Sequence, residues 1–109
     1  MGVTPLLKAC EKENENIVKY LVEHGADVNK KTESDETPLF KACKRGNENI
    51  IKCLIEHGAD VNKETYSGET PLFKACEKGN ENIVKYLVEQ GANINKENNI
   101  GKTPLYKVM

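Results

Sequence analysis

The sequence lacks the features that mark membrane, exported and nucleic-acid-binding proteins. It has no tryptophan, and aromatic residues make up only 6% of its 109 residues. No run approaches the roughly 18 consecutive apolar residues of a membrane helix, and the N-terminus lacks the basic-then-apolar layout of a signal peptide. The 16 basic and 17 acidic residues leave a formal net charge of −1, too small to draw the chain to nucleic acid or an anionic membrane. We therefore expect an intracellular protein, cytoplasmic or nuclear, that binds neither.

The apolar content is also too low for a thick globular core. Hydrophobic residues account for 38% of the chain and charged residues for 30%. A chain of this length forms one small domain and buries roughly 60 to 70% of the surface that it exposes when unfolded. A thin, elongated core suits this composition better. We expect a single domain over residues 1–109.

Cysteine and histidine are present, but not in the patterns that catalysis or metal binding requires. None of the four cysteines forms a Cys-x-x-Cys pair, and Cys10, Cys43 and Cys76 recur at one spacing. Because a catalytic residue has no reason to recur in this way, we interpret them as reduced, packed thiols. His24 and His57 recur at the same spacing and do not have zinc-ligand spacing. We predict no enzyme activity, no catalytic residues, no cofactor and no metal.

A 33-residue repeat is the dominant signal. Thr-Pro-Leu begins at positions 4, 37, 70 and 103, and Asn-Glu-Asn-Ile spans 14–17, 47–50 and 80–83. A fixed period of this length is the signature of a stacked repeat protein.

Each repeat contains the start and stop signals of two short helices. In the third repeat Thr70 can cap a helix that opens at Pro71, and Gly79 can end it. Asn80 or Asn82 can cap a second helix, which Gly91 ends. Its broader apolar face, which consists of Ile83, Val84, Leu87 and Val88, predicts that the second helix carries more of the core. Helices this short are unstable alone, so each pair must bury its apolar stripes against its neighbours.

The period, with its Thr-Pro-Leu, Gly-Asn, Leu-Val and Gly-Ala-Asp-Val-Asn segments, resembles the ankyrin repeat over essentially the whole chain. The resemblance implies an all-α solenoid of antiparallel helix pairs joined by projecting β-hairpin loops. The units would span residues 2–34, 35–67 and 68–100, with a partial fourth unit at 101–109. The repeat starts close to the first residue and the fourth unit stops at Met109. We therefore expect the chain to be a segment of a longer array, or an array that has been shortened. We expect it to be monomeric, with apolar edges at which copies can associate end to end.

Several positions depart from the family pattern. The family's histidine is replaced by Leu7, Phe40, Phe73 and Tyr106, so packing must substitute for its hydrogen bonds. Asp35 stands where the other units have a turn glycine, and Glu13 stands where Gly46 and Gly79 end the first helix. Glu tolerates a left-handed backbone less well than Asp. We therefore predict that the first unit opens first, as amide exchange can test.

The resemblance also implies that a partner binds the loop tips and the outer face of each first helix. The tips differ most between units, and Tyr66 is an exposed-loop aromatic of the kind found at interface centres. Lys44 and Arg45 are interpreted as a local basic spot for an acidic partner group. The predicted partner-binding residues are Glu33, Ser34, Glu36, Lys44, Arg45, Tyr66, Ser67, Glu69, Glu77, Lys78, Asn99, Ile100 and Lys102.

Three functions are consistent with these features. The first is a protein–protein interaction module without catalytic activity, and the partner's identity is not encoded in the repeat. The second is an engineered or consensus scaffold, favoured by the similarity of the units but opposed by the thiols and by Glu13, Asp35 and Phe40. The third is a targeting segment of a larger enzyme.

Overall fold

The computed structural model describes residues 2–104 and contains six helices in that range. They form three consecutive antiparallel pairs, so the predicted all-α solenoid is confirmed. Tyr106 and the remainder of the predicted fourth unit lie outside the described residues. The helices are α1 (Pro5–Glu11), α2 (Glu15–Glu23), α3 (Pro38–Arg45), α4 (Glu48–Glu56), α5 (Pro71–Lys78) and α6 (Glu81–Glu89).

The start signals act as the sequence predicts. The Oγ1 atom of Thr70 accepts a hydrogen bond from the Phe73 amide at 3.2 Å, and Pro71 is the first helical residue. Thr4 and Thr37 cap the N-termini of α1 and α3 in the same way. For the second helix the structure decides between the two candidates, because Asn80 is the cap and its Oδ1 accepts from the Ile83 amide at 3.1 Å.

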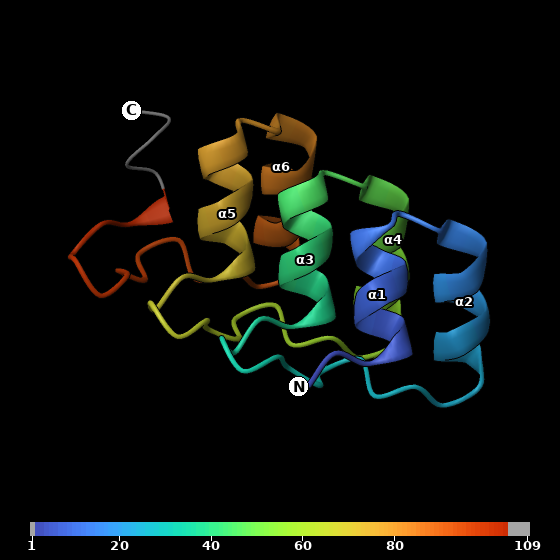
Figure 1. Ribbon diagram of the computed structural model, residues 1–109. Helices are drawn as coiled ribbons and strands as arrows, with labels where there is room; N and C mark the ends of the chain where they lie inside the picture. Colours follow the sequence, from blue (N-terminus) through green and yellow to red (C-terminus); the bar gives the residue numbers. More distant parts are fainter. Residues whose placement is uncertain (1, 105–109) are drawn as a thin grey trace.

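The helices stack in two rows (Figure 1). The first helices of the pairs, α1, α3 and α5, form the inner row, and α2, α4 and α6 form the outer row. The molecule is elongated, with principal extents of 39 × 28 × 21 Å. No helix within residues 2–104 is both long enough and apolar enough to cross a membrane.

The inner row, not the outer row, carries more of the core, so the sequence prediction was wrong on this point. Five residues of α5 are buried, whereas in α6 only Ile83 and Leu87 are. Val84 is half-buried and Val88 is exposed, which makes the buried stripe of α6 narrower than predicted. The reason is position: α3 packs against α1, α5 and its own partner α4, and neighbouring inner helices contact each other more extensively than α2 and α4 do. Leu7, Phe40 and Phe73, which replace the family's histidine, are buried.

Turns, rather than strands, form the loops that join the described units. In the second loop the Thr65 amide donates to the Glu69 carbonyl at 2.8 Å. Neighbouring loop tips are also linked to each other, since the Tyr66 amide donates to the Ser34 carbonyl and the Asn99 amide to the Ser67 carbonyl, both at 2.9 Å. The tips therefore form a bonded row along the stack.

Two residues that replace glycine at turns adopt the left-handed backbone conformation that glycine usually provides. Glu13 has φ of 58° and Asp35 has φ of 62°. In the second unit Gly46 closes α3 in the left-handed conformation, whereas α1 ends one residue earlier and is capped by Lys12. The sequence prediction of a strained or altered helix end in the first unit is therefore confirmed. Whether this unit opens first stays a prediction.

Candidate functional site

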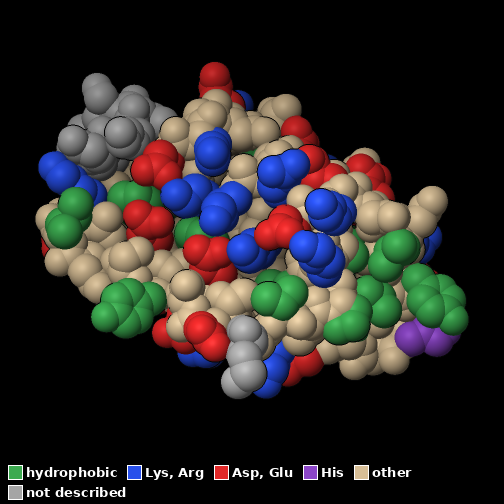
Figure 2. Space-filling model, viewed as in Figure 1, with side chains coloured by type: hydrophobic (Ala, Val, Ile, Leu, Met, Phe, Trp, Pro, Cys, Tyr) green, Lys and Arg blue, Asp and Glu red, His purple; other side chains and the backbone are tan. Residues whose placement is uncertain are grey.

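The predicted partner-binding residues lie on the loop tips and the inner row, where acidic and basic side chains interleave (Figure 2). The predicted set contains four glutamates and four lysines or arginines. The surface therefore favours neither a strongly acidic nor a strongly basic partner.

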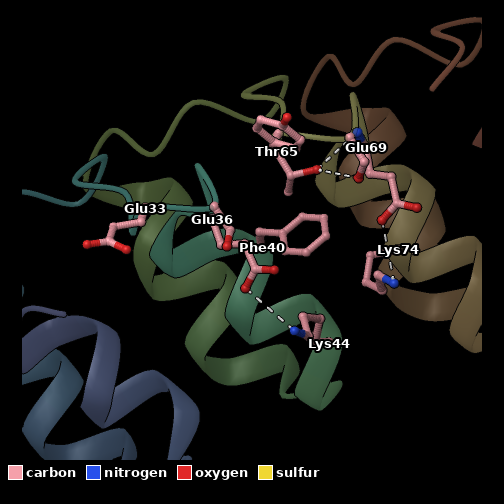
Figure 3. Close-up of a pocket in the computed structure, with 10 residues that line it drawn as sticks. Glu33, Glu36, Phe40, Lys44, Thr65, Glu69 and Lys74 are labelled. Atoms are coloured by element: carbon pink, nitrogen blue, oxygen red, sulfur yellow. Dashed lines mark hydrogen bonds and ion pairs between the residues drawn. The ribbon is translucent and has the colours of Figure 1, made fainter. Parts of the chain in front are cut away.

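A groove of about 420 Å³ lies where two loop tips meet α3 and α5 (Figure 3). It is lined by Glu33, Ser34, Glu36, Phe40, Lys44, Thr65, Tyr66, Ser67, Glu69 and Lys74. Seven of these ten were predicted from the sequence. The structure thus brings part of the predicted set together in one hollow between the second and third units.

The other predicted residues do not line this groove. They are Arg45, Glu77, Lys78, Asn99, Ile100 and Lys102, located at the ends of α3 and α5 and on the third loop. Ile100 is exposed on its tip, as Tyr66 is on the preceding tip.

Lys44 and Arg45 each lie beside a different carboxylate, and their interpretation as a basic spot for an acidic partner group stays a prediction. Lys44 Nζ lies 3.5 Å from Glu36 Oε1, and Arg45 Nη2 lies 3.3 Å from Glu13 Oε2 of the first unit. The two side chains point to different acidic partners because consecutive helical residues lie on different faces. Glu36 is shared, because its Oε1 also lies 3.0 Å from Lys41 Nζ.

Sequence reasoning missed Phe40, Thr65 and Lys74, because it assigned Phe40 to packing and took the site residues only from the loop tips and the outer face of each first helix. Lysine recurs at positions 8, 41 and 74, so a comparison of variable positions does not reveal Lys74. Lys74 Nζ lies 5.8 Å from the centroid of the Phe40 ring, which places a cation over the aromatic floor of the groove. Burial disfavours the charged form of Lys74, but the hydrogen bond to Glu77 and the charge of Glu69 outweigh it and raise the pKa.

Tyr66 is an exposed ring on a fixed backbone. Its side chain is 79% exposed at the rim of the groove. Its amide donates to the Ser34 carbonyl at 2.9 Å, and its carbonyl accepts from Asn99 Nδ2 at 3.1 Å. Because the preceding and following tips both hold the backbone, the ring is presented with little backbone freedom left to lose on binding.

The thiols are arranged for packing. Cys10, Cys43 and Cys76 are buried and unbridged, as predicted, and Cys53 is the more exposed of the four. Burial raises the pKa of Cys10 to about 12, with a smaller contribution from Cys53. Burial, with the charges of Glu56 and Glu23, also raises the pKa of Cys53. A raised pKa disfavours the thiolate, which is the nucleophilic form.

The histidines occupy helix ends, as predicted. His24 and His57 are the C-terminal caps of α2 and α4, and each Nδ1 lies 2.8 Å from a backbone carbonyl of its own helix. Within residues 2–104 no three His, Cys, Asp or Glu side chains are grouped so that they would hold a metal ion.

Comparison with protein families matches the chain to the family described as ankyrin repeats (3 copies). The match covers residues 1–65, 25–98 and 63–108 in overlapping segments. A search of curated proteins found no match. Ankyrin repeats are generally protein–protein interaction modules, and they typically bind other proteins. The repeat spacing, the paired helices and the family match agree over nearly the entire length: this chain belongs to the ankyrin-repeat family.

Proposed function

We propose that this chain binds a partner protein in the groove between the second and third units and on the adjoining loop tips, without catalysing a reaction. One observation carries the proposal: Tyr66 is exposed at the rim while hydrogen bonds from both neighbouring tips fix its backbone. Aromatic anchors that are fixed before binding contribute strongly to interface affinity.

The groove favours a partner segment that is partly apolar and carries charges of both signs. Tyr66 supplies exposed aromatic surface beside the buried Phe40 ring, while Glu33, Lys44 and Glu69 supply charges around it. The groove is open, so it suits a segment of a protein chain better than an enclosed small molecule.

A binding role without catalysis is supported by the protonated, packed state of the thiols. The pKa values of all four cysteines are raised by burial. Four unbridged cysteines are also consistent with a reducing compartment. The proposal therefore includes an intracellular location.

The test uses two exposed tyrosines as a matched pair. A partner is isolated on the immobilised chain, identified, and its affinity is measured by calorimetry for wild type, Tyr66→Ala and Tyr20→Ala. Tyr20 is 62% exposed on α2, away from the groove. We expect Tyr66→Ala to weaken binding by roughly tenfold or more and Tyr20→Ala to leave it unchanged.

Equal affinities for wild type and Tyr66→Ala would rule out the groove as the binding site. A second variant, Lys74→Met, keeps much of the stem over Phe40 but removes the charge. A loss of affinity in this variant with circular dichroism unchanged would assign a binding role to the lysine charge.

A further inference from the structure

The turns in the first and second loops share one backbone shape but differ at one residue. In the first loop the Asp35 amide donates to the Thr32 carbonyl at 2.9 Å. In the second loop the Gly68 amide donates to the Thr65 carbonyl at the same distance. The backbone at this position is left-handed in both turns, with φ of 62° at Asp35 and 81° at Gly68. The two turns therefore differ here by the Cβ and the carboxylate that Asp35 carries.

The glycine leaves space that the next loop tip uses. A Cβ on Gly68 would lie only 2.5 Å from Asn99 Oδ1 and 3.1 Å from the Asn99 amide nitrogen. The Asn99 side chain therefore lies against the glycine, and its Nδ2 donates to the Tyr66 carbonyl at 3.1 Å. Gly68 is buried. The third tip thus folds one side chain back onto the second tip.

Tyr66 occupies the same place above Asp35 that Asn99 occupies above Gly68. It stands one 33-residue period before Asn99, and the amide of each donates to a carbonyl of the preceding tip at 2.9 Å. The Tyr66 side chain is nevertheless 79% exposed. Because the turns and the bond between tips match, the Cβ of Asp35 takes up the space that the Asn99 side chain uses one junction later.

Without this Cβ, an aromatic ring would favour the folded-back position. A ring can cover the bare backbone of a neighbouring glycine, and burial of its apolar surface stabilises that arrangement. The Asp35 carboxylate lies 3.5 Å from Lys31 Nζ of its own loop. Since the charge of Asp35 is engaged within that loop, we assign the effect on the next tip to the Cβ.

We propose that Asp35 is a positioning residue, whose Cβ keeps the Tyr66 ring turned outward and available to a partner. Its consequence for binding rests on the proposed function, whereas the direction of the ring is a property of the free chain. A folded-back ring is not available, so the apparent Kd rises as the fraction of chains with an outward ring falls.

Solution NMR of the free chain tests the direction of the ring. In Asp35→Gly we expect nuclear Overhauser contacts between the Tyr66 ring and the α protons of position 35. The ring should also lose roughly half of its line broadening by a soluble paramagnetic probe, because the outward state is less populated. Asp35→Asn is the matched control, since it keeps the Cβ, tolerates the left-handed backbone and removes the charge. Its Tyr66 ring should behave as in wild type.

Tyr20 serves as the internal reference in the same spectra. Its side chain is 62% exposed on α2, so its broadening should be the same in all three chains. An unchanged Tyr20 signal and an unchanged amide spectrum of α3 show that the variants are folded.

Gly68→Asn makes the reciprocal change at the next junction. Asparagine tolerates the left-handed backbone, but its Cβ would meet the Asn99 side chain. We expect Asn99 to turn outward and lose its bond to the Tyr66 carbonyl, so that its side-chain amide protons exchange at least about threefold faster. Unchanged exchange would overturn the claim that a Cβ at this turn sets the direction of the next side chain.

Binding of the partner measures the consequence. Asp35→Gly should weaken affinity by about threefold to tenfold, and Asp35→Asn should leave it unchanged. In the Tyr66→Ala background, Asp35→Gly should have no further effect, because the side chain that it repositions is absent. An equal loss in both backgrounds would overturn the proposal, since Asp35 would then act on the partner without Tyr66.

Two results in the free chain would also overturn it. They are a Tyr66 ring that is equally exposed in wild type and Asp35→Gly, and a ring that folds back in Asp35→Asn as well. Failure of the proposed function gives a different result, in which Tyr66→Ala binds the partner as wild type does. If the ring still folds back in Asp35→Gly, that result removes the groove as the binding site and supports the positioning role of Asp35.

Discussion

The first and second units are built from one repeat, but they differ in what covers them and in how their turns close. Ile50 of α4 is 1% exposed because α2 packs beside it, whereas Ile17 of α2 is 48% exposed. α3 ends at a left-handed glycine, whereas α1 ends one residue earlier and Glu13 takes the left-handed backbone. Position in the stack, rather than local sequence, thus sets how much each helix contributes to stability.

The largest expected difference in the free energy of unfolding is between substitutions at Ile50 and at Ile17. We expect Ile50→Ala to lower the free energy of unfolding by about 3 kcal/mol, because it leaves a cavity between α2 and α4. Ile17→Ala removes the same atoms from a half-exposed site and should cost less than about 1 kcal/mol. Urea titration of both variants measures the difference. Equal losses would show that the neighbouring unit does not determine this contribution.

The threonine caps give a smaller difference. Thr37 is 1% exposed and its Oγ1 accepts from the Phe40 amide at 3.2 Å, while Thr4 makes the same bond to Leu7 at a partly exposed site. Thr37→Ala should cost about 1.5 kcal/mol and Thr4→Ala about 0.5 to 1 kcal/mol, because water can replace the cap only at the exposed site. Serine at each position should restore most of the loss, which makes Thr37→Ser and Thr4→Ser the matched controls in the same titration.

The elements of the fold were predictable because their signals are local. Thr70 before Pro71 fixes the start of α5, and Gly79 fixes its end, without reference to any distant residue. The relative burial of the two rows was not predictable in this way. Val88 belongs to the apolar stripe of α6 by period but is exposed, because burial depends on which helices pack beside it.

The candidate site was predictable in part for a related reason. Comparing units at matched positions found Tyr66 and Lys44, which vary, and missed Lys74, which recurs, while Phe40 had been assigned to packing alone. A groove between two units uses scaffold residues and variable residues together. The pairing of Arg45 with Glu13 of the first unit also depends on stacking, so no reading of a single unit reveals it.

Glu13→Gly tests whether the left-handed glutamate after α1 makes this helix end less stable than the end of α3, which has glycine. Relief of the left-handed strain should stabilise the protein by about 0.5 to 1 kcal/mol, reduced by loss of the exposed pair with Arg45. Glu13→Gln keeps the strain but removes the charge, so it separates the two contributions. Native-state amide exchange in α1 should slow in Glu13→Gly relative to wild type. Unchanged exchange in α1 would mean that this turn does not set the opening of the first unit.

The smallest effect is expected at Asp35, which has nearly the same φ as Glu13 but a shorter side chain. Aspartate tolerates the left-handed region better than glutamate, and Asp35 lies 3.5 Å from Lys31 in an exposed pair that glycine would lose. Asp35→Gly should therefore change the free energy of unfolding by less than about 0.5 kcal/mol in either direction. Urea titration beside Glu13→Gly compares the two sites directly. A gain at Asp35 as large as that at Glu13 would mean that the left-handed backbone itself, and not the side chain placed on it, sets the cost of replacing glycine in this stack.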